Sequence, residues 1–72
     1  MTLFDGNSGE TYKILSICGS VRIRLSELGF NPGCEIKILN KQHTDIMVVN
    51  CRESHIALRK EEAQCIFVAI VK

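Results

Sequence analysis

The residues best suited to chemistry in this 72-residue chain are its four cysteines and two histidines. Thiolates and imidazoles are metal ligands, and two thiols can also oxidise to a disulfide. The cysteines are widely and evenly separated and include no CxxC pair, which most zinc ribbons and knuckles require. Each lies in or beside an apolar, strand-like segment, so we expect reduced thiols that pack as small hydrophobic side chains. They are Cys18, Cys34, Cys51 and Cys65.

Three potential metal ligands lie near one short reversal of the chain. Cys51 and His55 flank this reversal, where they could approach each other across two strands, and His43 lies in the preceding loop. A metal site needs more convergent, deprotonated ligands than these three residues offer. We therefore predict no metal site, and Cys51, His55 and His43 are the candidate ligands to examine.

No pattern in the sequence predicts catalysis. No set of Ser, His and Asp has a supporting motif, and a triad is defined by geometry rather than by the presence of its residues. Gly29-x-x-x-Gly33 lacks the Gly-Lys-Ser/Thr that completes a phosphate-binding loop. Glu61 and Glu62 are adjacent, so they point in different directions from a helical turn. We expect no catalytic residues and a protein that is not an enzyme.

Length and composition predict a single domain over residues 1–72. The hydrophobic content of 46% is sufficient for a core without metals or disulfides. The net charge of +1 gives no electrostatic reason to expect nucleic acid or an anionic membrane as a partner. No apolar run reaches the roughly 18–20 residues of a membrane-spanning helix. The N-terminus lacks the features of a signal peptide, so we expect a cytoplasmic protein.

The segment 20–33 predicts a short helix with a sharp end. Val21, Leu25 and Leu28 share one face at helical spacing, and Ser20 is the expected N-cap. Gly29 is placed to adopt the left-handed conformation that ends a helix, after which the next residue can pack back on Leu25. Pro32-Gly33 then predicts a type II turn.

The rest of the chain is rich in β-formers. The strands expected are Thr11–Cys18, Cys34–Leu39, Ile46–Cys51, Ser54–Leu58 and Cys65–Val71, with a loop over Asn40–Asp45 and a helical turn over Arg59–Gln64. The last strand is nearly continuous in apolar residues, so we expect it to be buried between others. Ile36 and Ile38 should point inward, with Leu39 and Met47 on the opposite strand faces from these and Val48. Leu3 should fill one end of the core.

These elements predict a mainly β protein, an SH3-like partly open barrel of five strands. One short helix joins the first two strands, and the helical turn precedes the last strand. Closing such a sheet on itself removes exposed edges and encloses a core in a short chain. The OB-fold is the nearest alternative, but its helix normally lies between the third and fourth strands.

Two blocks of sequence carry a resemblance to a known family. Arg24–Gly33 reads RLSELGFNPG and Ile56–Ala63 reads IALRKEEA, in that order and followed by a β-rich end. The chain is thereby similar to the FeoA family, the small cytosolic ferrous iron transport protein A. The resemblance covers nearly the whole chain, although Arg52-Glu53-Ser54 stands where members often carry Gly in a reversal.

The resemblance implies an SH3-like barrel and an accessory role in bacterial ferrous iron uptake. The implied partner is the cytosolic GTP-binding part of the membrane transporter FeoB, so contact with the membrane would be only through this partner. The same domain type resembles the C-terminal module of iron-dependent repressors. We expect no cofactor and at most a weak association with Fe²⁺. The alternative function is a small nucleic-acid-binding or metal-sensing SH3-like module.

Ile23 is the residue that suggests a docking surface. It lies away from the apolar face of its helix, so it is either exposed or covered by an N-terminal arm around Leu3 and Phe4. Of the two, we expect cover by the arm, and the functional hypothesis is that Arg22, Ile23 and Glu27 form part of a docking patch. The open edge of an incomplete barrel could also pair with a second copy of the chain.

Overall fold

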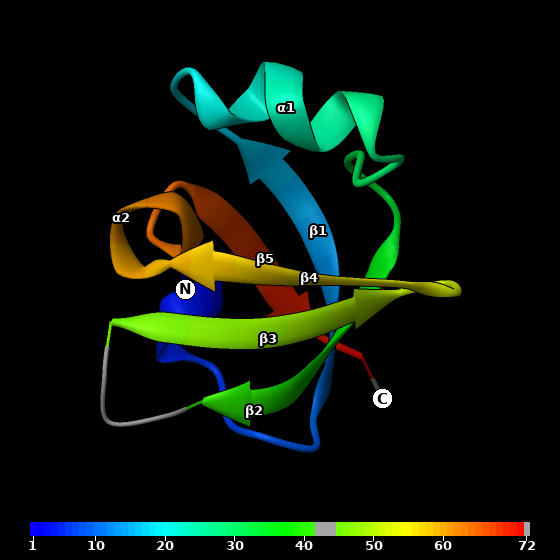
Figure 1. Cartoon of the computed structure of the whole chain (residues 1–72). Coiled ribbons are helices and arrows are strands. Elements are labelled where there is room, and N and C mark those ends of the chain that lie inside the picture. Colours follow the sequence, from blue (N-terminus) through cyan, green and yellow to red (C-terminus); the bar gives the residue numbers. More distant parts are fainter. Residues whose placement is uncertain (42–44, 72) are drawn as a thin grey trace.

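The computed structural model describes residues 1–41 and 45–71, in which five antiparallel strands are joined by short helices (Figure 1). The elements, in chain order, are η1 (Leu3–Asp5), β1 (Thr11–Ile17), α1 (Val21–Glu27), β2 (Glu35–Lys41), β3 (Ile46–Cys51), β4 (Ser54–Arg59), α2 (Lys60–Ala63) and β5 (Ile66–Ile70). The predicted strands and helices are confirmed to within two residues at their ends. Residues 42–44 of the predicted loop lie outside the described residues, and β2 extends to Lys41 before them.

The strands form one curved sheet in the order β4-β3-β2-β1-β5. All four pairings are antiparallel, and the first strand lies between the second and the last. Figure 1 shows the strands wrapping around a common interior, with α1 at one end of the sheet and α2 between β4 and β5. The predicted mainly β class is therefore confirmed. No helix in residues 1–41 and 45–71 is long and apolar enough to cross a bilayer.

Two β-bulges bend the sheet, and the extra residue of each is a leucine. The register between β1 and β5 shifts between Ile14 and Ser16, and that between β2 and β3 shifts between Ile38 and Asn40. The extra residues are Leu15 and Leu39, and both are exposed. A bulge adds local twist and interrupts the alternation of side chains. The bulge at Leu15 therefore interrupts the alternation of buried and exposed residues within β1.

The interior is filled by alternate side chains of the strands and by single residues from the helices. Ile36 and Ile38 point inward as predicted, but Met47 does so too, at 1% exposure, whereas Val48 is half-buried. Met47 lies opposite Val48, as predicted, but on the inward face with Ile36 and Ile38, because the inward residues of this strand are Met47 and Val49 rather than Val48. The core comprises Leu3, Tyr12, Ile14, Ile17, Val21, Leu25, Phe30, Ile36, Ile38, Met47, Val49, Cys51, Leu58, Ala63, Ile66 and Val68.

β5 is an edge strand, contrary to the prediction that it would be buried between others. Its outer side is partly covered by the chain's first residues: Thr2 forms an isolated bridge with Phe67, and the Val68 N–H donates to the Met1 carbonyl at 2.9 Å. Leu3 is fully buried and completes the core, as predicted. The N-terminal residues, which are far from β5 in the sequence, thus pair with part of an apolar edge strand that could otherwise pair with another chain.

α1 ends in the predicted manner but begins differently. Gly29 has a φ of +87°. Its N–H donates to the Ser26 backbone carbonyl, and the Phe30 N–H donates to the Leu25 carbonyl at 2.8 Å. These two bonds define a Schellman motif, and Phe30 enters the core in place of Leu28, which is 45% exposed against expectation. Ser20 is the N-cap, but its side chain makes no capping bond because its backbone is already helical.

Two tight turns contain residues with positive φ. The Cys34 N–H donates to the Asn31 carbonyl at 3.0 Å, and Gly33 has a φ of +94°, which confirms the turn predicted at Pro32-Gly33. In the two-residue connection between β3 and β4, Arg52 has a φ of +60°. Arg52 therefore takes the left-handed conformation, which is uncommon for a residue other than Gly.

Candidate docking groove

One face of α1 forms the wall of a surface groove. Arg22, Ile23, Ser26 and Glu27 are related by spacings of three and four residues, so their side chains lie together on the helix. The opposite face carries Val21 and Leu25, which are buried in the core. All three residues of the predicted docking patch, Arg22, Ile23 and Glu27, are thus brought to the same surface.

The groove has an apolar floor and a polar rim. Its volume is about 410 Å³, and its lining residues are Ile17, Arg22, Ile23, Ser26, Glu27, Phe30, Asn31 and Pro32. Ile17 and Phe30 are buried and belong to the core, so the floor is rigidly supported. Asn31 and Pro32 also line the groove, and the Schellman motif and the following turn hold them in place.

Ile23 is open to solvent rather than covered by the N-terminal arm. Its side chain is 64% exposed, the largest fraction among the large hydrophobic residues described. The arm packs elsewhere: η1 contacts β5 and α2, and the Phe4 ring lies beneath the Nζ atoms of Lys41 and Lys60, at 4.7 and 5.6 Å. The expectation of cover by Leu3 and Phe4 was therefore wrong.

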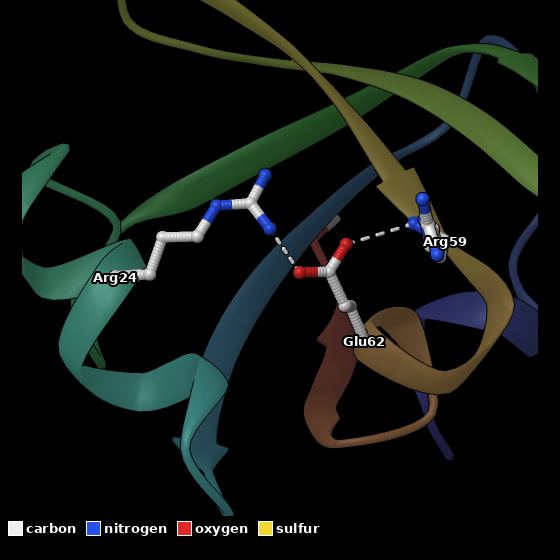
Figure 2. Close-up of polar contacts among 3 residues, drawn as sticks. All are labelled: Arg24, Arg59 and Glu62. Carbon is white, nitrogen blue, oxygen red and sulfur yellow. Dashed lines mark hydrogen bonds and ion pairs between the residues drawn. The ribbon is translucent and has the colours of Figure 1, made fainter.

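A polar contact fixes α1 relative to α2. Figure 2 shows Glu62 between Arg24 and Arg59. One carboxylate oxygen of Glu62 accepts from the Arg24 guanidinium, and the other accepts from the Arg59 backbone N–H at 3.0 Å. Arg24 does not line the groove and instead makes this ion pair. Among the described residues, it is the only arginine of α1 that pairs with a carboxylate.

The two candidate metal ligands that the structure describes, Cys51 and His55, do not converge. Cys51 pairs with Ser54 and points into the core, whereas His55 pairs with Asn50 on the other face of the hairpin and is exposed. His43 lies outside the described residues. Within residues 1–41 and 45–71, no three His, Cys, Asp or Glu side chains are grouped as metal ligands would be.

The four thiols are free but differ in their surroundings. Cys51 is buried, Cys34 and Cys65 are half-buried, and Cys18 is exposed. The expectation of buried cysteines therefore fails for Cys18, which follows the last residue of β1. Burial, together with the neighbouring thiol of Cys34, raises the pKa of Cys51. Cys51 is thereby kept protonated and behaves as a small core residue.

The sequence predicts three of the eight residues that line the groove. It places Ile17 only in a strand, Phe30 only after the helix stop, and Pro32 only in a turn. Helical spacing was enough to group Arg22, Ile23 and Glu27. The useful additional signal was the Gly29 stop, because a Schellman motif reverses the chain and brings the residues after it beside the helix.

Comparison with known proteins places these features in a family. Among solved structures, FeoA of Stenotrophomonas maltophilia complexed with zinc is similar over 96% of this chain and 89% of that one, with 26% identity and a TM-score of 0.85. That protein is described as a prokaryotic SH3 domain protein suggested to act as a ferrous iron transport activating factor. The fold is thus the predicted SH3-like one.

A family model described as the FeoA domain matches residues 1–70, and the chain belongs to the FeoA family, which is associated with ferrous iron transport. The FeoA protein of Chlorobium tepidum is 31% identical, with a TM-score of 0.92 over 100% of this chain and 71% of that one. A manganese-dependent transcriptional repressor shares the fold alone, at 17% identity, with a TM-score of 0.87 over 99% of this chain and 41% of the repressor. A comparison with curated protein sequences gave no match.

Proposed function

We propose that this protein is a cytoplasmic accessory factor of bacterial ferrous iron uptake. It binds the cytosolic GTP-binding part of the FeoB transporter through the groove beside α1. The observation that carries this proposal is the exposed Ile23 above an apolar floor, within a family associated with ferrous iron transport. Its role is binding rather than catalysis.

The chemistry of the groove indicates what part of the partner fits it. Ile23 and Pro32 line the groove together with the buried Phe30, a setting that accepts an apolar side chain. Burying a side chain the size of isoleucine contributes about 1.5–3 kcal/mol. Arg22 and Glu27 carry opposite charges on the same wall, so they favour a partner segment with complementary charges on either side of its apolar residue.

A titration tests the proposal. The full chain, labelled with a fluorophore at its N-terminus, is mixed with the purified cytosolic part of the transporter loaded with either a non-hydrolysable GTP analogue or GDP. We expect saturable binding in at least one nucleotide state. The absence of binding in both states would contradict the proposed function.

A further inference from the structure

Two cysteines far apart in the sequence lie opposite each other where β1 ends and β5 begins. Ile17 pairs with Ile66 in the antiparallel register, so the next pair is Cys18 with Cys65. The Cys18 N–H donates to the Cys65 carbonyl at 2.9 Å. Directly opposed residues of antiparallel strands have Cα atoms about 4.5–5.5 Å apart, within the roughly 4.4–6.8 Å that disulfides span. The register therefore places the two backbones at a separation that a disulfide can span.

The two side chains also approach each other. The neighbouring Cys18 thiol raises the pKa of Cys65, because its proximity favours the protonated form of that group. Gly19 has no side chain to crowd Cys65. A Cβ added at Gly19 would lie 3.7 Å from the Cys65 sulfur, which is an ordinary van der Waals distance. Cys18 is exposed and Cys65 half-buried, so a small reagent reaches Cys18 first.

The other two thiols differ in access. Cys51 is 3% exposed, so a small reagent in solution does not reach its sulfur. The Cys34 sulfur lies 3.7 Å from the Gly29 carbonyl and 3.9 Å from the Arg52 guanidinium. Cys34 and Cys51 are neighbours, but neither of these two thiols is exposed, whereas Cys18 is. Access therefore selects the pair of Cys18 and Cys65.

Two thiols alone are better suited to redox chemistry than to a divalent metal. Structural zinc sites use four protein ligands and catalytic ones use three. Among the described residues, no third His, Cys, Asp or Glu joins this pair in a metal-binding group. Disulfides of cytosolic proteins are usually transient, catalytic or redox-sensing, and a partly exposed pair fits that pattern.

We propose that Cys18 and Cys65 are a reversible oxidation site that low-molecular-weight disulfides convert to an intramolecular disulfide. The Cys18 thiolate attacks one sulfur of the small disulfide, forms a mixed disulfide and releases one small thiolate. The Cys65 thiolate, its proton lost to solvent, then attacks the Cys18 sulfur and displaces the second small thiolate. Two protein thiols are thereby oxidised, and one small disulfide is reduced to two thiols.

The link would join the connection that leads into α1 to the start of β5. Cys18 lies three residues before Val21, the first residue of α1, and directly after Ile17 on the groove floor. The proposal itself does not depend on the protein's partner, because the reaction needs only this chain and a small disulfide.

Peptide mapping tests this site without ambiguity, because trypsin separates the four cysteines. Cleavage after Lys and Arg places Cys18, Cys34, Cys51 and Cys65 in peptides 14–22, 25–37, 42–52 and 61–72. The reduced full chain is incubated at low concentration with excess oxidised glutathione, quenched with an alkylating reagent, digested and analysed by mass spectrometry. We expect 14–22 linked to 61–72 as the first and main product, and its loss on treatment with dithiothreitol.

Matched variants complete the test. In Cys65→Ser the reaction should stop at a mixed disulfide of Cys18 with glutathione, whereas Cys34→Ser should leave the 14–22 to 61–72 link unchanged. The proposal is overturned if the main product joins 25–37 to 42–52 or two copies of the chain. A wild-type product that stops at the glutathione adduct would overturn it equally.

Discussion

The two helices that connect strands use their surfaces in opposite ways. α2 joins the two edge strands, its Ala63 is fully buried, and the Lys60 N–H donates to the Asp45 carbonyl at 2.7 Å. α1 buries only one side and leaves Ile23 and its neighbours open beside a groove. The difference indicates that α2 closes the barrel, whereas α1 is an anchored helix with a free face for a partner.

The largest expected effect concerns the anchor of α1. Leu25 is fully buried, so Leu25→Ala should lower the free energy of unfolding by about 2–5 kcal/mol through lost burial and the cavity left behind. Chemical denaturation of both proteins measures this. Ser26→Ala, on the exposed face one residue away, should stay within about 0.5 kcal/mol of wild type. Equal losses for the two variants would show that α1 has no distinct buried and open faces.

A second effect concerns the closed packing of α2. Ala63 has no exposed surface, so Ala63→Leu should destabilise the protein by about 1–3 kcal/mol through overpacking. Its neighbour Gln64 is exposed, and Gln64→Leu serves as the control with little expected change. Equal melting temperatures for these two variants would contradict the close packing of α2 around Ala63.

The smallest effect concerns the contact that joins the two helices. Arg24 is half exposed, so its ion pair with Glu62 should contribute only about 0.2–1 kcal/mol. A double-mutant cycle with Arg24→Ala and Glu62→Gln measures the coupling directly. The coupling should shrink at high salt because exposed charges are screened. A coupling that is independent of salt would argue against a solvent-exposed ion pair.

Local signals in the sequence were sufficient for most elements of the fold. The Gly29 stop and the Pro32-Gly33 turn act through backbone conformation, and the structure has the predicted positive φ at both glycines. The bulges at Leu15 and Leu39 were not predictable, because a disrupted alternation is also what two covered faces would produce. The edge position of β5 depends on cover by Met1 and Thr2, which only the folded chain reveals.

Only part of the groove could be predicted, because local sequence patterns do not specify contacts between distant segments. Arg22, Ile23 and Glu27 are close in sequence on one helix, so their spacing was informative. The position of Asn31 and Pro32 beside the groove depends on the reversal of the chain after the helix. The pairing of Cys18 with Cys65 depends on the register of β1 and β5. Each of these needed contacts between segments that the local pattern does not specify.

The most direct test of the account compares two exposed isoleucines. Ile23 is 64% exposed in the groove, and Ile70 is 59% exposed at the end of β5, away from it. Each is replaced by Asp, folding is checked by circular dichroism, and binding to the nucleotide-loaded cytosolic part of the transporter is measured by calorimetry. We predict that Ile23→Asp raises the Kd by about 10-fold or more, a loss of at least about 1.4 kcal/mol, while Ile70→Asp binds as wild type does. A folded Ile23→Asp protein with the wild-type Kd would contradict the assignment of the groove as the docking surface.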